Sequence, residues 1–120
     1  MIPVDQTVFG APHGNCFSAA VASIMELPLS EVPFFMGSDD WWPGFLAWLL
    51  PRGWVAAYIP KEDLGGLRPK GFYILSGQSP RGPHVVVAEG YQVVHDPNPK
   101  RDGLVGPTDG IFLLLKGASR

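Results

Sequence analysis

The sequence predicts a single α+β domain over residues 1–120, in which an N-terminal helix packs on an antiparallel sheet of about four to five strands. Helix-like segments come first and short β-like runs follow from residue 54, which is the order of an α+β fold. Hydrophobic residues make up 46% of the chain and charged residues 17%, so the chain can bury enough apolar surface to fold. The Gly and Pro residues separate apolar runs, as turn residues do.

The first helix is expected over residues 16–27. It follows an extended start at residues 2–8 and a loop in TVFGAPHG, which holds two Gly and a Pro. Asn15 is a good N-cap for it, and its small residues allow close packing against a sheet. Ser30 then caps a short turn that Pro33 limits.

A second helix is expected in DDWWPGFLAWLLPRG. Asp39 or Asp40 would cap it, Pro43 is compatible with its first turn, and Pro51 with Gly53 ends it. Its apolar residues follow helical spacing and are typical of a core: Trp41, Phe45, Trp48 and Leu49.

Five later runs have the texture of strands, because they are short, rich in β-branched or aromatic residues, and separated by Gly, Pro and Asp. These runs are WVAAYI, GFYILSG, HVVVAEG, YQVVHD and GIFLLLK. A hairpin turn is expected at Glu89-Gly90, between the third and the fourth run.

The composition argues against several classes of protein. The net charge of −2 comes without a basic stripe, so a nucleic-acid partner is not expected. The apolar runs are shorter than the roughly 20 residues that cross a bilayer, and the first ten residues lack the features of a secretory signal. A single Cys cannot form an internal disulfide, so a cytoplasmic protein is expected.

The only cysteine, Cys16, opens the first predicted helix. Free backbone N–H groups and the helix dipole favour negative charge at that position, so a thiol there ionises below its usual pKa of about 8.5. The thiolate is the attacking form. The alternative is a structural thiol in the core, because free Cys is among the most buried residue types.

A reactive thiol needs a base, and the base needs an orienting group. His84 begins one predicted strand and Asp96 closes the next. An even pairing register, as with a three-residue loop, places Asp96 on the face of His84. A strict two-residue loop at Glu89-Gly90 places His95 there instead. Together with Cys16, these residues are the parts of a thiol hydrolase. Gln6 is a candidate oxyanion donor beside the backbone N–H of Cys16.

The order of these residues resembles that of papain-like cysteine peptidases, most closely the compact bacteriocin-processing (C39-like) branch. The segments GNCFSAAVASIMELPLSEVP, ILSGQSPRGPHVVV and VVHDPNPKRDGL are also similar to a group of small phage, prophage and bacterial proteins. The resemblance implies a papain-like fold with Cys16 as nucleophile, His84 as base, Asp96 as orienter and Gln6 at the oxyanion hole. The Gln of that family usually stands about six residues before the Cys, whereas ten separate Gln6 from Cys16 here.

Two further residues are candidates for substrate binding. Arg81, in the loop before His84, could receive a carboxylate or a chain terminus, although solvated loop Arg residues are common. Trp42 could line a cleft between helix and sheet.

The leading hypothesis is hydrolysis of an amide, peptide or isopeptide bond in a protein or peptide substrate, through a thioester at Cys16 and without a cofactor. The same residues could deamidate Gln or transfer an acyl group. A zinc site that uses His13, Cys16, His84, His95 and Asp96 is one alternative. Another is a non-catalytic binding or regulatory protein of phage or prophage origin.

Overall fold

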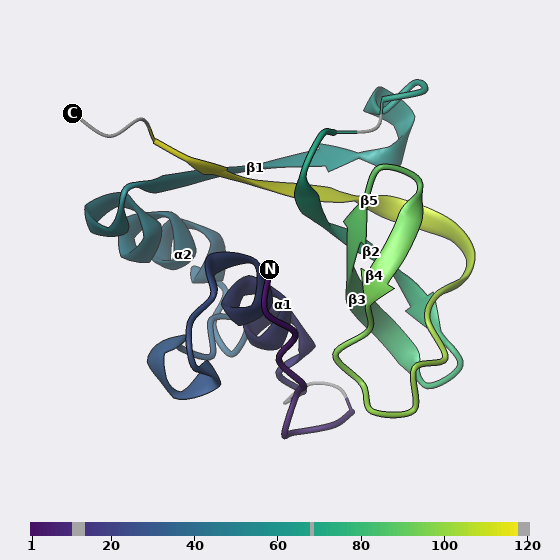
Figure 1. The fold of residues 1–120 in the computed structure, drawn as a ribbon, viewed down its shortest axis with the longest axis horizontal. Helices are drawn as coiled ribbons and strands as arrows, with labels where there is room; N and C mark the ends of the chain where they lie inside the picture. Colours follow the sequence, from purple (N-terminus) through teal and green to yellow (C-terminus); the bar gives the residue numbers. More distant parts are fainter. Residues whose placement is uncertain (11–13, 68, 118–120) are drawn as a thin grey trace.

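A computed structural model describes residues 1–10, 14–67 and 69–117. It is an α+β fold in which two helices lie beside a five-stranded antiparallel sheet, as the sequence predicts. The helices α1 (Cys16–Met25) and α2 (Trp41–Leu49) come first in the chain, and the strands follow (Figure 1). Three short 3-10 helices lie at Leu29–Glu31, Leu50–Arg52 and Lys61–Asp63.

Helix α1 is the central buried helix. Every residue from Phe17 to Ile24 is buried, because small side chains let the helix lie close to its neighbours. The helix ends at Met25, two residues before the predicted end, since Glu26 turns into the left-handed conformation with φ 60° and ψ 45°.

The prediction that the side chain of Asn15 caps α1 is wrong. Asn15 precedes α1, but its side chain makes no capping hydrogen bond. Its Oδ1 instead accepts from the backbone N–H groups of Thr7 and Val8, at 3.0 and 2.9 Å, and its Nδ2 donates to the Thr7 hydroxyl at 3.0 Å. The amide therefore fastens the N-terminal segment to the start of α1.

The other predicted caps also lack capping bonds. Pro28 precedes the turn at Leu29–Glu31, so Ser30 lies inside it. Asp40 occupies the N-cap position of α2 without a side-chain bond to the helix, and its own N–H donates to the Ser38 hydroxyl at 3.1 Å. Helix α2 is stabilised by packing instead. Phe45 and Leu49 are fully buried.

An aromatic cluster joins the two helices to the sheet. The ring of Phe17 in α1 meets Trp41, Phe45 and Phe112 edge to face, with centroids 5.1 to 5.3 Å apart. Trp41 and Phe45 belong to α2, and Phe112 to the sheet. The main core lies where these rings meet.

The sheet has the strand order β1-β5-β2-β3-β4, and all neighbouring strands are antiparallel. The strands are β1 (Trp54–Pro60), β2 (Phe72–Ser79), β3 (Gly82–Glu89), β4 (Gln92–His95) and β5 (Val105–Lys116). All five predicted strand runs are found. The strand β5 begins five residues before its predicted run, at Val105.

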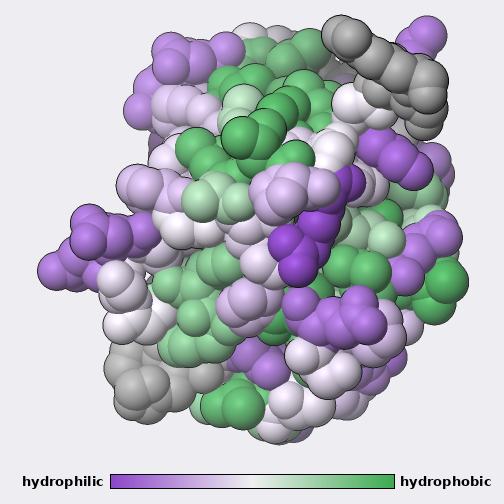
Figure 2. Space-filling view, turned by 90° about the vertical axis from the view of Figure 1, so that its left-hand side faces the viewer, coloured by the Kyte–Doolittle hydropathy of each residue, from purple (hydrophilic) through white to green (hydrophobic). Residues whose placement is uncertain are grey.

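On the surface near α2, apolar patches alternate with hydrophilic side chains (Figure 2). Within the described ranges, every helix is too short or too polar to cross a lipid bilayer.

Candidate active site

Cys16 is the first residue of α1 and is half-buried. It lines a cavity of about 680 Å³ together with Gln6 and His84. Three segments that lie far apart in the sequence therefore meet at this cavity: the N-terminal segment, the start of α1 and the start of β3.

His84 and Asp96 form a buried pair. The His84 Nε2 lies 2.6 Å from the Asp96 Oδ1, and the two residues are 7% and 5% exposed. His84 is the third residue of β3, and Asp96 directly follows β4.

The register between β3 and β4 explains why Asp96 reaches His84. Glu89 pairs with Gln92, so the hairpin loop consists of two residues, Gly90 and Tyr91. The turn therefore lies one residue later than the expected turn at Glu89-Gly90. A bulge then shifts the register, so that His95 pairs with Val87. Continued by one residue, this register puts Asp96 opposite Val86 and diagonal to His84 on one face. The even register expected from a longer turn is thus produced by a bulge.

The carboxylate of Asp96 is fixed on both oxygens. Its Oδ1 also accepts from the Asn98 N–H at 2.9 Å, and its Oδ2 accepts from the Gly103 N–H at 2.7 Å. The Arg101 guanidinium donates to the Asp96 backbone carbonyl. Burial alone raises the pKa of Asp96, but the bonds from His84 and from these two N–H groups outweigh it, so the pKa lies below its usual value.

The ring of His84 lies between an acid and the thiol. Burial lowers the pKa of His84, but hydrogen bonds and charge interactions with Cys16 and Asp96 outweigh it, so the pKa lies above its usual value. An ionised carboxylate only accepts hydrogen bonds, so Nε2 carries a proton. In the neutral ring Nδ1 is then the acceptor, and it is the nitrogen left for the thiol.

Gln6 lies in the cavity wall and is 6% exposed. Its backbone N–H donates to the Pro97 carbonyl at 2.9 Å, which joins it to the loop after Asp96. Its Nε2 donates to the Val8 carbonyl at 2.9 Å and retains a second hydrogen, whereas its buried Oε1 has no partner in the described chain. The ten-residue spacing therefore still brings Gln6 to the cavity of Cys16.

The remaining candidates lie in different surroundings. The Nε2 of His95 lies 2.9 Å from the Val4 carbonyl and 3.4 Å from Asp5, so Asp96 and not His95 contacts His84.

Of the two candidates for substrate binding, Trp42 packs in the aromatic cluster, with its ring 5.9 Å from that of Phe112, and does not line the cavity. Arg81 does line the cavity, and its Nη1 lies 2.6 Å from the Asp102 carboxylate.

The zinc alternative has no assembled ligand set among the described side chains, because no three His, Cys, Asp or Glu residues there are grouped to hold a metal. His13 lies outside the described residues.

Sequence reasoning missed several residues of the cavity wall. Asn98 and Lys100 line it beside Pro99, and the apolar residues Phe9 and Met36 line it as well. The signal for Asn98 was present in Asp-Pro-Asn-Pro, because Asp and Asn side chains readily bond to the N–H two residues ahead. Asp96 does so to Asn98, and Asn98 to Lys100, so two successive turns fold the loop back on the site.

Comparisons with protein-family models, curated proteins and solved structures found no match for this chain.

Proposed function

We propose that the protein is a cysteine hydrolase that cleaves an amide, peptide or isopeptide bond through a thioester at Cys16. The observation that carries the proposal is the buried 2.6 Å contact between Asp96 and His84, because His84 lines the same cavity as Cys16. A base held by an acid beside a half-buried thiol is the arrangement needed for nucleophilic catalysis.

In this mechanism the Nδ1 of His84 takes the thiol proton, and the Cys16 Sγ attacks the substrate carbonyl carbon. The oxyanion accepts hydrogen bonds from the Cys16 backbone N–H and from the second Nε2 hydrogen of Gln6. His84 then gives its proton to the leaving amine as the carbon–nitrogen bond breaks. Water, deprotonated by His84, attacks the thioester and releases the acid and the thiol. Asp96 stabilises the imidazolium throughout.

The resemblance to papain-like peptidases of the C39-like branch supports the same roles, and we propose a papain-like fold on that ground. With an amine in place of water the same residues would transfer the acyl group, and with a Gln side chain as substrate they would deamidate it. A free nucleophilic thiol suits a reducing compartment, so we propose that the protein acts in a cytoplasm, which is the host cytoplasm if a phage encodes it.

The test is the rate at which iodoacetamide alkylates Cys16 between pH 5 and 9. A thiol paired with an imidazolium should react well below pH 8. We expect His84→Ala to slow the reaction at pH 6.5 by about 100-fold, the lower end of what a positioned base contributes. His95→Ala is the matched control, because this equally buried ring faces Val4 and Asp5.

Reaction only above pH 8, with equal rates in wild type and His84→Ala, would contradict the proposal. That result would favour a binding or regulatory protein that does not catalyse turnover.

A further inference from the structure

The cavity has a second polar wall, separate from Cys16 and His84. The hairpin between β2 and β3 contributes Arg81 to it, and the loop after β4 contributes Asn98 and Lys100. Besides His84, the described lining holds two cationic residues, Arg81 and Lys100, and no Asp or Glu. The wall therefore favours an anionic group.

The two cations are not equivalent. The Arg81 guanidinium is already paired with Asp102 at 2.6 Å, and this ion pair ties the hairpin to the loop after β4. The ammonium of Lys100 makes no ion pair with any residue in the described part of the chain. Lys100 therefore supplies the uncompensated charge, and Arg81 mainly holds the two loops together.

Asn98 supplies a directed donor beside that charge. The residue is 6% exposed, and its Oδ1 accepts from the Lys100 N–H at 2.9 Å. Its Nδ2 has no hydrogen-bond partner among residues 1–10, 14–67 and 69–117, and the residue lines the cavity. Among the described residues the only fully buried side-chain atom without a partner is the Oε1 of Gln6, so the Asn98 Nδ2 is reachable from the cavity and free to donate to a ligand there.

We propose that Lys100 and Asn98 bind a carboxylate of the substrate, next to the amide that Cys16 attacks. The inference rests on the proposed hydrolase function and narrows its substrate to peptides or amides with a free carboxylate close to the scissile bond. The rest of the lining is mostly apolar and includes Phe9 of the N-terminal segment and Met36 of the chain before α2. A chain terminus with an apolar residue fits this combination, because its α-carboxylate and its side chain would meet chemically matching walls.

The experiment measures how well small peptides protect Cys16 of the full chain from iodoacetamide. The probes are acetyl-alanyl-leucine, its C-terminal amide, and acetyl-leucyl-glutamic acid α-amide, whose only carboxylate is on the side chain. We expect the first to protect at a concentration about tenfold lower than its amide does, which corresponds to one charge-assisted hydrogen bond. Protection by the third probe equal to the first would show that the site accepts side-chain carboxylates as well as chain termini, and would overturn the preference for a terminus.

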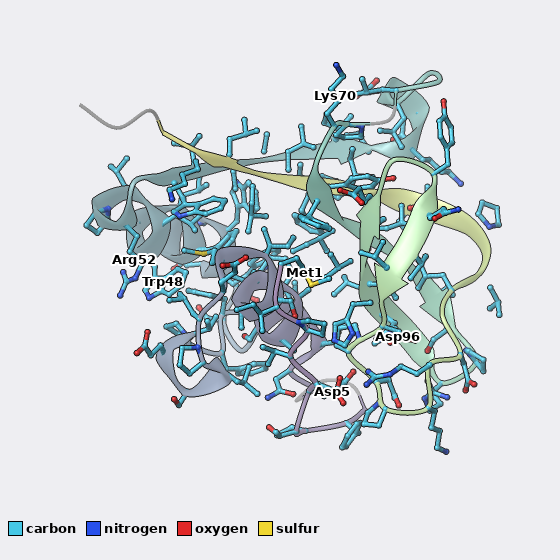
Figure 3. The ribbon with its side chains drawn as sticks, in the orientation of Figure 1. Met1, Asp5, Trp48, Arg52, Lys70 and Asp96 are labelled. Atoms are coloured by element: carbon cyan, nitrogen blue, oxygen red, sulfur yellow. The ribbon has the colours of Figure 1, made fainter. Side chains whose placement is uncertain are left out.

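Two variants test whether Lys100 and Asn98 cause the preference for the acid over the amide. Lys100→Gln removes the charge, and Asn98→Asp keeps the acceptor for the Lys100 N–H while it replaces the donor by a carboxylate. Both should remove the preference for the acid over the amide. Lys70→Gln is the control, since it removes the same charge from an exposed residue that lies far from Asp5 and Asp96 (Figure 3).

Equal protection by the acid and the amide, no protection by either, or equal behaviour of Lys100→Gln and Lys70→Gln would overturn the carboxylate site. Failure of the hydrolase proposal has a different signature, namely slow alkylation that His84→Ala leaves unchanged. Protection can still be measured in that case at pH 9, where an ordinary thiol reacts, so the two failures are distinguishable.

Discussion

The two walls of the cavity are held in place by different kinds of contact. On the sheet side, His84 and the carboxylate of Asp96 form a buried hydrogen-bonded pair, and Asp96 accepts two further backbone hydrogen bonds. On the opposite side, the N-terminal segment that carries Gln6 is held by neutral hydrogen bonds and by ion pairs that reach solvent, such as that of the Met1 amino group with Glu26 at 2.7 Å. Val4 donates to the Ser23 hydroxyl at 2.9 Å and accepts from His95, and Gln6 donates to Pro97.

The segment also has an ion pair, between Asp5 and Arg101 at 2.5 Å, but both side chains are more than one-third exposed. Asp5 and Asp96 lie near each other, and Arg101 bonds to both residues (Figure 3). Solvent screens the exposed pair and not the buried one. The difference implies that the wall with the reactive ring depends on charge and pH, whereas the wall with Gln6 depends on the sum of several small contacts.

The largest expected effect is a difference in stability between variants of Asp96 and of Asp5. Asp96→Ala leaves His84 buried without its acid, so we expect a loss of about 3–5 kcal/mol in the free energy of unfolding. Asp5→Ala removes a screened pair and should cost about 0–1 kcal/mol. Urea unfolding of both variants measures the comparison, with Asp96→Asn to separate loss of charge from loss of shape. Similar losses of unfolding free energy in Asp5→Ala and Asp96→Ala would contradict the difference between the two walls.

The pH dependence of stability should come from His84 and Asp96, on the sheet side of the cavity (the sheet wall). The pKa of Asp96 is lowered, so its contribution is present above the unfolded value of about 4 and is lost as the pH falls through the folded value. The pKa of His84 is raised, so its contribution is complete below about pH 6.5 and is lost as the pH rises through the folded value. Unfolding in urea from pH 3 to 9 should therefore show a decline at each end.

Two variants sharpen this expectation. His84→Gln should abolish the decline that begins above pH 6.5. Cys16→Ala should move that decline to lower pH, because Cys16 contributes to the raised pKa of His84. An unchanged alkaline decline in His84→Gln would place its origin elsewhere in the protein.

The sheet wall could largely be predicted from the sequence, because strand periodicity and pairing register are local signals. The runs HVVVAE and YQVVHD place His84 and Asp96 at facing strand ends once the pairing is even. The bulge that makes it even could not be predicted, since nothing in Gln92–His95 distinguishes a bulged strand from a regular one. The sequence therefore left His95 and Asp96 as alternatives, and the contact with His84 separates them.

The N-terminal wall could be predicted only in part. Its tethers run from side chains to backbone atoms far away in the sequence, such as His95 to Val4 and Ser23 to Val4. Such contacts leave no periodic pattern. Asn15 shows the difficulty: its residue type is typical of a helix cap, and only the folded chain shows that the Thr7 and Val8 N–H groups compete for the same oxygen.

An effect smaller than that of Asp96→Ala tests whether Asn15 fastens the N-terminal segment. Asn15→Ala removes three exposed hydrogen bonds, and we expect a loss of about 1–2 kcal/mol in the free energy of unfolding. Ser is as good a helix cap as Asn but is too short to bridge to both Thr7 and Val8, so Asn15→Ser should lose as much as Asn15→Ala. Asn15→Asp keeps the acceptor oxygens and should remain close to wild type. Full recovery in Asn15→Ser would show that capping of α1, and not the bridge to the N-terminal segment, is what this side chain contributes.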